Sequence, residues 1–400
     1  MADNKKGEEK RAVHTDIKSV RKTERSIRTL KRILAVLIVL LIGLIIYTTY
    51  PFWLPMLEDI FDKPSETIAN NGELESGNFP IDPDEDSYEI YAVKNNLMTA
   101  DAYNLVFYDE NGKERSSYSY SYSNPIVRVS SKRVLVFDSG SYDFAVYNKS
   151  GEIYSKSLDE VILTGAIGAD GTAAIVTESD KYASVMTVYD GDGKEIYSYS
   201  CTQRIIAVSI DDDGEGCTLC TFSSDDGEIY SQARTLDFSE DGEQMLSDSL
   251  ECLALGCVKN DAGNIVVVGD TGIYTVSSEG GLVSSLDFDG ELLSMSMDSS
   301  CTALLVSSNT DDSFSLIIAQ ADAQSDESYR IVEADSSSKL VRIADDRVLL
   351  LSSGKVESYA FSATIAATAE LEKEYSDMVY INGALYLSGK QGIDKLAFEM

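Results

Sequence analysis

A single histidine limits the chemistry that this sequence can support. His14 is the only histidine in 400 residues, and it lies in a basic N-terminal segment. The rest of the chain therefore has no Ser-His-Asp triad, no Cys-His pair and no histidine-ligated metal. Residues 1–32 hold 5 of the 67 Asp and Glu, so 62 follow them. An enzyme that works with carboxylates alone stays open, although no pair of carboxylates stands out.

Six cysteines lie close together in the sequence, between residues 201 and 301. Cys217 and Cys220 have Cys-x-x-Cys spacing, but no second such pair accompanies them. Their segment is typical of one strand, on which residues three apart point to opposite faces and lie about 10 Å apart. That separation is too large for a disulfide. Buried free thiols are favoured, with disulfides between neighbouring structural units or a metal site as alternatives.

Two acidic loops and two tyrosine stripes are the remaining candidates for binding. Asp190-Gly-Asp-Gly193 and Asp211-Asp-Asp-Gly214 could hold calcium, but neither matches a full calcium loop, and Asp and Gly suit tight turns. One stripe consists of Tyr118, Tyr120 and Tyr122, and the other of Tyr197 and Tyr199. Such stripes stack on sugars or on a protein partner, or pack within the fold, which we favour. We assign no catalytic, cofactor-binding or metal-ligating residue and no cofactor.

An apolar segment divides a basic tail from an acidic remainder. Residues 1–32 carry 11 of the 33 Lys and Arg and 5 acids, whereas the other 368 residues carry 22 Lys and Arg and 62 acids. No charged residue occurs between Arg32 and Glu58. We predict a transmembrane helix at 33–54, because about 20 apolar residues span a bilayer. A cleaved signal peptide and a buried core helix are the alternatives that we weighed.

The flanking charges predict the orientation and partners of this anchor. Basic residues stay on the cytoplasmic side, so residues 1–32 form a cytoplasmic tail and the C-terminal part lies outside the cell membrane. The tail is expected to contact anionic lipid headgroups. Five of the six prolines lie between Pro51 and Pro83, and residues 58–87 are also rich in Asp, Glu, Asn, Gly and Ser. We therefore predict an extracellular stalk at residues 55–87. The acidic remainder should not bind nucleic acid.

Residues 88–400 are predicted to form short strands that recur in a repeating pattern. An apolar strand, a polar turn and an outer strand recur, with turn glycines at Gly112, Gly151, Gly193, Gly242 and Gly280. Their spacings are 39, 42, 49 and 38, and a period near 40 with four strands is typical of a β-propeller blade. The longest spacing is expected to hold an extra hairpin near residues 225–228. Cys217 and Cys301 begin equivalent strands in blades two apart.

The repeats predict an all-β, eight-bladed propeller, with seven blades as the alternative. Eight units start near residues 88, 125, 161, 204, 251, 292, 338 and 377. The last unit is one strand short. Closure of the ring therefore needs a strand from before residue 88, or it leaves the last blade open.

A basic N-terminus, one anchor, a proline-rich stalk and degenerate Tyr-x-x-x-Gly blades resemble an uncharacterised family of single-pass, membrane-anchored propellers from Gram-positive bacteria. The blades also resemble WD40-like and quinoprotein-like repeats. The resemblance implies the architecture and a location at the cell envelope, but no activity. WD40 Gly-His and Trp-Asp signatures are absent, and Trp53 is the only tryptophan, which argues against a quinone cofactor.

These observations favour a non-enzymatic binding or scaffolding module at the cell envelope, whose propeller recognises an envelope protein or glycan. The alternative is a carboxylate-dependent hydrolase that acts on envelope polymers. A signalling receptor with a recruiting tail is a third hypothesis. The ligand, the oligomeric state and the pairing of cysteines do not follow from the sequence.

Overall fold

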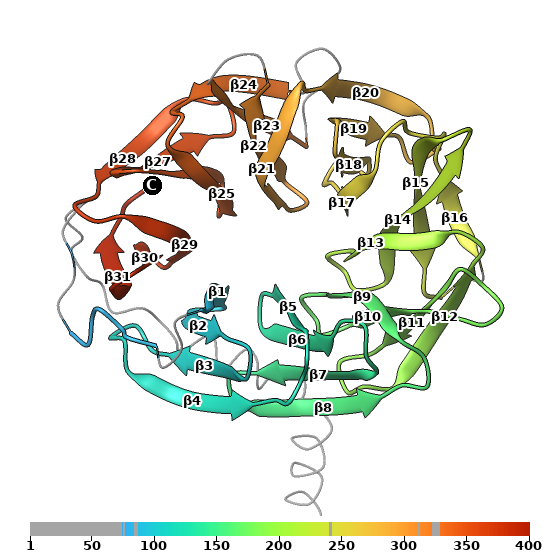
Figure 1. Ribbon diagram of the computed structural model, residues 1–400, viewed down its shortest axis with the longest axis horizontal. Coiled ribbons are helices and arrows are strands. Elements are labelled where there is room, and N and C mark those ends of the chain that lie inside the picture. The colour runs from blue at the N-terminus through green and yellow to red at the C-terminus, as the bar shows by residue number, and fades with distance from the viewer. Residues whose placement is uncertain (1–73, 75–76, 84–86, 240–241, 310–312, 322–328) are drawn as a thin grey trace, which may run out of the picture. The chain divides into compact units, whose positions relative to one another are not determined.

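The structure is a computed structural model that describes residues 74, 77–83, 87–239, 242–309, 313–321 and 329–400. The predicted tail and anchor at residues 1–32 and 33–54 lie outside the described residues, as does most of the predicted stalk at 55–87. In the described part of the chain, no helix is long and apolar enough to cross a bilayer. The regular elements of this part are 31 β-strands, arranged in eight separate sheets around a ring (Figure 1).

The first four blades each contain four strands. Blade 1 has β1 (Glu89–Val93), β2 (Asn96–Ala100), β3 (Asn104–Tyr108) and β4 (Glu114–Ser119). Blade 2 has β5 (Pro125–Ser130), β6 (Arg133–Asp138), β7 (Asp143–Asn148) and β8 (Gly151–Ser157). Blade 3 has β9 (Ile162–Ile167), β10 (Ala173–Thr177), β11 (Ser184–Tyr189) and β12 (Glu195–Cys201). Blade 4 has β13 (Arg204–Ile210), β14 (Gly216–Asp225), β15 (Glu228–Asp237) and β16 (Glu243–Leu246).

The other four blades complete the ring. Blade 5 has β17 (Ala254–Lys259), β18 (Ile265–Gly269), β19 (Gly272–Val276) and β20 (Leu282–Asp287). Blade 6 has β21 (Gly290–Met297), β22 (Cys301–Ser308), β23 (Phe314–Gln320) and β24 (Tyr329–Ala334). Blade 7 has β25 (Ser338–Ala344), β26 (Arg347–Ser352), β27 (Lys355–Ala360) and β28 (Ile365–Glu370). Blade 8 has β29 (Tyr375–Ile381), β30 (Ala384–Gly389) and β31 (Gly392–Ala397).

Eight blades confirm the predicted fold, and the blades begin close to the predicted starts. Within each blade the strands are antiparallel and neighbours in sequence are neighbours in the sheet. The first strand of each blade lies nearest the centre and the fourth lies at the rim (Figure 1). Antiparallel order places the connections between first and second strands on one face of the ring, which we call the first-turn face. The connections between second and third strands lie on the opposite face, which we call the second-turn face.

The core of the propeller lies between the blades. Eight clusters of buried hydrophobic residues each join two neighbouring blades. On β6, for example, Val134 and Val136 pack toward blade 1, whereas Leu135 and Phe137 pack toward blade 3. A strand that is buried on both faces reads as a continuous apolar run, because neither face meets water. This explains the apolar runs of the sequence, which form the second strands of their blades.

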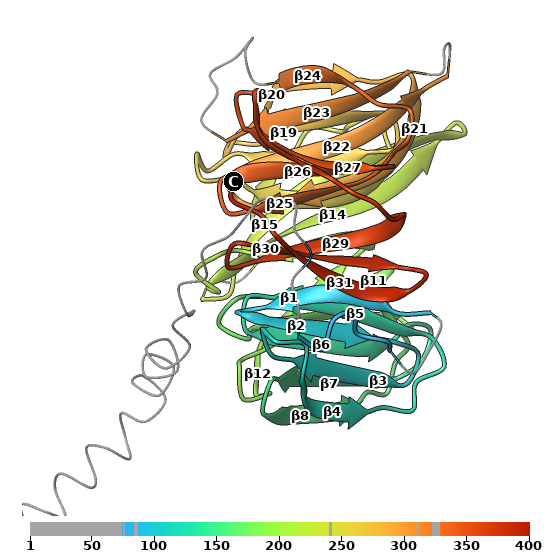
Figure 2. The ribbon, with the colours of Figure 1, turned by 90° about the vertical axis from the view of Figure 1, so that its left-hand side faces the viewer.

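Residues from before residue 88 supply the pairing that blade 8 lacks. Leu74 and Ile81 form antiparallel bridges with Leu396 and Ile393 of β31. Ile81 donates its N–H to the Ile393 carbonyl at 2.9 Å and accepts the Ile393 N–H at 2.7 Å. Blade 8 lies beside blade 1 in both views (Figures 1 and 2). The strand pairing of the propeller therefore begins before residue 88, where we had placed the boundary.

Closure also requires a glycine at the start of β31. Gly392 has φ +99°, and a Cβ built there would lie 2.2 Å from the Ile81 carbonyl oxygen. Ile81 itself is buried in the cluster that joins blade 8 to blade 1. The two ends of the described chain are thus joined by backbone hydrogen bonds and by an apolar core.

The prediction of an extra hairpin in blade 4 was wrong. β14 and β15 are instead 10 residues each and pair along their whole length, from Gly216 with Asp237 to Asp225 with Glu228. Asp226 and Gly227 make the turn with positive φ. The additional residues lengthen an existing hairpin, because a two-residue turn with positive φ continues the ladder without interruption.

Candidate functional site

The first strands of the blades surround the centre of the ring, which we call the central channel, and they carry charged and polar side chains. A cavity of about 600 Å³ occupies the first-turn end of this channel, on the side of blades 2 to 6. The walls come from five first strands and the turns that follow them: β5, β9, β13, β17 and β21. Ligand sites in proteins are usually concave and mix apolar walls with a few polar groups, so this cavity is the candidate site.

Apolar side chains form part of the wall of this cavity. The walls include Ile206 and Val208 of β13 and Met295 and Met297 of β21. Gly256 of β17 lies against both methionines, and a Cβ built on it would lie 3.0 Å from the Met297 sulfur. The backbone of blade 5 therefore approaches blade 6 closely here. Methionine adapts its shape, so this part of the wall can adjust to what enters the channel.

An ion pair joins blades 4 and 5 at the mouth of the cavity. Lys259 Nζ at the end of β17 donates to Asp211 Oδ2 at 2.9 Å, across the gap from β13. The hydrogen bond from Lys259 to Asp211 raises the pKa of the lysine, because it stabilises the ammonium. Burial raises the pKa of the Asp211 carboxyl, despite this hydrogen bond. Asp212 and Asp298 add further acidic groups to the same lining.

A second polar network crosses the channel wall where blades 7, 8 and 1 meet. Arg342 of β25 donates to Asp377 Oδ1 of β29 at 3.1 Å. The same Asp377 oxygen accepts the Met378 N–H at 2.8 Å, and the Ile90 N–H of β1 also bonds to this carboxylate. Burial raises the pKa of Asp377 above its ordinary value, and Arg342 opposes this rise. One carboxylate thus holds three successive blades together.

Glu89 and Tyr91 of β1 extend this network. The Tyr91 hydroxyl donates to Glu89 Oε2, and burial together with this bond raises the pKa of Tyr91. Glu89 raises the pKa of Asp377 through its charge. Two carboxylates on neighbouring strands, one exposed and one partly buried, therefore occupy different environments in the same channel wall.

The two acidic loops of the sequence are turns in the structure. Asp190 accepts the N–H groups of Asp192 at 3.0 Å and Lys194 at 2.9 Å, and Asp109 of blade 1 makes the same pair of bonds. In the other loop, Asp211 accepts the Gly214 N–H through its carbonyl. These bonds favour the turn interpretation over calcium. Among the described residues, no three His, Cys, Asp or Glu side chains are arranged to hold a metal ion.

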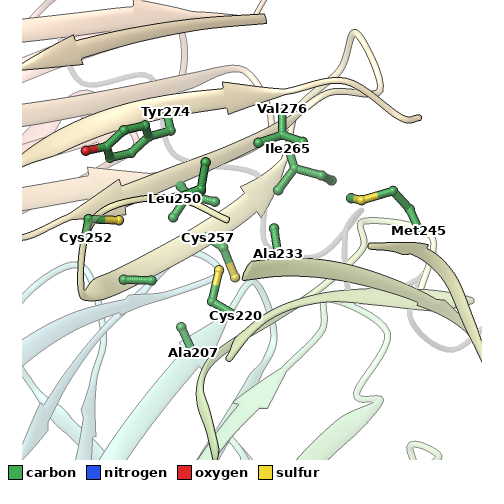
Figure 3. Packing of buried hydrophobic residues seen from close by; sticks show 12 residues of the cluster. Ala207, Cys220, Ala233, Met245, Leu250, Cys252, Cys257, Ile265, Tyr274 and Val276 are labelled. Carbon is green, nitrogen blue, oxygen red and sulfur yellow. The ribbon is translucent and has the colours of Figure 1, made fainter. Parts of the chain in front are cut away.

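All six cysteines are buried and unbridged, in agreement with the favoured interpretation. Cys217 packs between blades 3 and 4, and Cys220 packs between blades 4 and 5, so the two point to opposite faces of β14. Cys220 and Cys257 point toward one another from neighbouring blades (Figure 3). Cys217 and Cys301 lie near the starts of the second strands of blades 4 and 6, which are the predicted equivalent positions.

The tyrosine stripes pack against the neighbouring blade, as we favoured. Tyr118 stacks on Tyr147 of blade 2 with ring centroids 6.0 Å apart. The ring of Tyr197 lies beside that of Phe238 of blade 4, with the ring centroids 5.4 Å apart. The strongly exposed tyrosines are different residues, which the sequence analysis missed: Tyr103, Tyr142 and Tyr182. Their signal in the sequence is a tyrosine shortly before the third strand of three successive blades.

The ring, its channel and its interblade cores define a protein of the eight-bladed β-propeller class. The chain belongs to a family described as "Family of unknown function (DUF5711)", whose model matches residues 77–398. This confirms an uncharacterised propeller family. The comparison with curated proteins gives no match.

Two solved structures show the same fold at low sequence identity. BamB from Moraxella catarrhalis is 10% identical, with a TM-score of 0.51, and the match covers 78% of this chain and 96% of BamB. The computationally designed Ika8 protein is 11% identical, with a TM-score of 0.53, and the match covers 78% of this chain and 95% of Ika8. At these identities the likeness extends to the fold alone.

Proposed function

We propose that this protein is a binding or scaffolding module of the cell envelope. In this proposal, residues 33–54 anchor the chain in the cell membrane as a single helix. Residues 1–32 remain in the cytoplasm against anionic lipid headgroups, and the propeller lies outside, where it binds an envelope protein or glycan. The lack of charge between Arg32 and Glu58 and the basic residues before it support this orientation.

The observation that carries the binding function is the composition of the channel wall. Two ion pairs in this wall hold neighbouring blades together: Lys259 with Asp211 across blades 4 and 5, and Arg342 with Asp377 across blades 7 and 8. A channel whose charges stabilise the ring leaves recognition to the broad faces and the turns around it. Binding through surface loops on a rigid scaffold fits this arrangement better than catalysis.

Crosslinking of intact cells with a membrane-impermeant reagent tests this function. The full-length tagged chain is purified after crosslinking, and the captured species are identified by mass spectrometry. One reproducible envelope protein or glycan should be captured, and its amount should fall when excess purified propeller competes outside the cell. Capture of nothing above the level of an unrelated anchored domain would contradict the proposal.

A carboxylate-dependent hydrolase remains the second candidate because of Glu89 and Asp377. The two carboxylates lie on neighbouring strands, and burial raises the pKa of Asp377, which suits a general acid. If this candidate holds, the full-length protein turns over envelope glycans, and Glu89→Gln and Asp377→Asn each abolish turnover while the fold persists. Without turnover by the wild-type protein, the hydrolase is rejected.

A further inference from the structure

Three exposed tyrosines occupy related positions on one face of the propeller. Tyr103, Tyr142 and Tyr182 are 57%, 46% and 43% exposed. They lie in the connections between β2 and β3, β6 and β7, and β10 and β11. All three connections are on the second-turn face, in consecutive blades 1, 2 and 3 (Figure 1). We call these three residues the tyrosine arc.

The fold does not require tyrosine at these positions. The Tyr103 carbonyl accepts the Tyr120 N–H, and the Tyr142 carbonyl accepts the Leu158 N–H, both at 2.8 Å. In blades 5 and 7 the same backbone bond is made by Thr271 and Gly354. The backbone therefore holds this turn with a small residue as well as with tyrosine. Tyr103 and Tyr142, together with Tyr182 in the corresponding connection of blade 3, nevertheless expose aromatic surface to solvent.

The surroundings of the tyrosine arc are acidic. Among the second-turn-face segments of blades 1 to 3 (residues 101–103, 120–124, 139–142, 158–161, 178–183 and 202–203), Lys181 is the single basic residue, and Arg204 at the start of β13 pairs with Glu178 at 3.4 Å. The same segments contain five acidic residues: Asp101, Asp159, Glu160, Glu178 and Asp180. Asp159, Glu160 and Asp180 are exposed. Carboxylates beside exposed aromatic rings attract cations in two ways, through charge and through the faces of the rings.

We propose that the tyrosine arc is a docking surface for a polypeptide segment rich in arginine and lysine. The guanidinium and ammonium groups lie over the tyrosine rings, and the flanking carboxylates neutralise them. Charge complementarity selects this occupant over a neutral glycan, for which the acidic groups have no use. The inference rests on the proposed binding function and names the surface and partner class for it. Tyrosine also serves interfaces well, because it gives a large contact area with few rotatable bonds.

A triple substitution removes the rings without changing the charge. The full-length chain in detergent is titrated with a fluorescent peptide that alternates arginine and serine. Tyr103→Ser, Tyr142→Ser and Tyr182→Ser together should weaken binding about tenfold, because each exposed cation–π contact contributes a few-fold. The matched control changes three exposed residues of the outer strands to serine: Leu282, Ile331 and Ile365. These side chains are 49%, 58% and 56% exposed. Their replacement by serine should leave the affinity for the peptide unchanged.

Other outcomes overturn the inference. Equal weakening by both triple variants would show that the arc has no special part in binding. Equal affinity of the wild type for a glutamate-serine peptide would reject a basic partner. A basic partner would also be rejected if the tyrosine variant lost binding to chitin oligosaccharides but kept its affinity for the arginine-serine peptide. If the tyrosine variant still captures its envelope partner from intact cells, this surface is wrong while the binding function stands. If wild type captures nothing from cells, the proposed function fails independently of the peptide result.

Discussion

Asp377 shows how individual residues hold the propeller together. Its carboxylate contacts Arg342 of blade 7 and the main chain of blades 8 and 1. Such a group satisfies backbone donors that would otherwise stay unpaired in the wall, and an unpaired buried donor is costly. The cost of this arrangement is the partial burial of a charge, which raises the pKa of Asp377.

This pKa predicts a pH dependence of stability. Because folding raises the pKa of Asp377 above its unfolded value of about 3.9, its contribution is fully present below that value. The contribution is lost as pH rises through the folded pKa. Asp377→Asn cannot ionise, so the melting temperature of wild type relative to this variant should fall as pH rises from about 4 toward 7. Thermal unfolding of both proteins across this pH range measures the difference between their melting temperatures. A difference that stays constant or increases with pH contradicts the prediction.

The cysteines lie in the interblade cores, and their burial determines their reactivity. The hydrogen bond with Cys257 and burial raise the pKa of the Cys220 thiol, and burial raises that of Cys217. The thiolate is the reactive form, so these thiols should be inert in the folded protein.

Thiol labelling tests this directly. A maleimide should label none of the six cysteines of the native full-length protein and all six after unfolding without reductant. A reducing control sample should give the same total. Rapid native labelling would contradict the burial, and fewer than six labels after non-reducing unfolding would reveal a disulfide, with Cys220 and Cys257 as the nearest pair to examine.

Several residue-level features could be predicted from the sequence because they depend on local geometry. Strand parity separated Cys217 from Cys220, and Asp and Gly spacing identified turns such as Asp190-Gly-Asp-Gly193. The recurrence of tyrosine before the third strands is visible in the sequence, but the exposure of Tyr103 could not be predicted, because it depends on the neighbouring blades. Asp377 and Glu89 likewise meet only because the ring brings the two ends of the chain together.

At the scale of elements, closure depends on a segment outside the repeats. Ile81 pairs with Ile393 through two backbone hydrogen bonds, and its side chain is buried between blades 8 and 1. Counting strands in the sequence predicted that blade 8 is one strand short, and it left open whether residues before 88 complete the blade or the blade stays open. It did not identify Ile81, since one buried residue within a proline-rich segment has no strand periodicity.

Ile81→Ala should therefore destabilise the ring. Loss of this buried side chain should lower the free energy of unfolding by about 2–4 kcal/mol, through lost burial and a residual cavity. Urea unfolding of the full-length chain measures the change. Ile365→Ala, at a site that is 56% exposed on β28, is the control and should cost less than about 0.5 kcal/mol. Equal effects of the two substitutions would contradict closure through Ile81.

At the scale of the whole molecule, counting repeats predicted the eight-bladed propeller correctly, because each blade contains the same sequence pattern of strands and turns. The first strands start within a few residues of the predicted units, and eight interblade clusters close the ring. The location at the envelope rests on different observations, namely the apolar segment at residues 33–54 and the basic residues before it. These lie outside the described residues, so the central claim of an externally displayed binding propeller needs its own measurement.

Protease accessibility in cells tests that claim most directly. Cells that express the full-length chain with different epitopes at its two ends are treated with protease, either intact or after permeabilisation. We predict that intact cells lose the C-terminal epitope and keep the N-terminal epitope, and that permeabilised cells lose both. A C-terminal epitope that survives in intact cells and disappears only after permeabilisation would place the propeller inside and contradict the account.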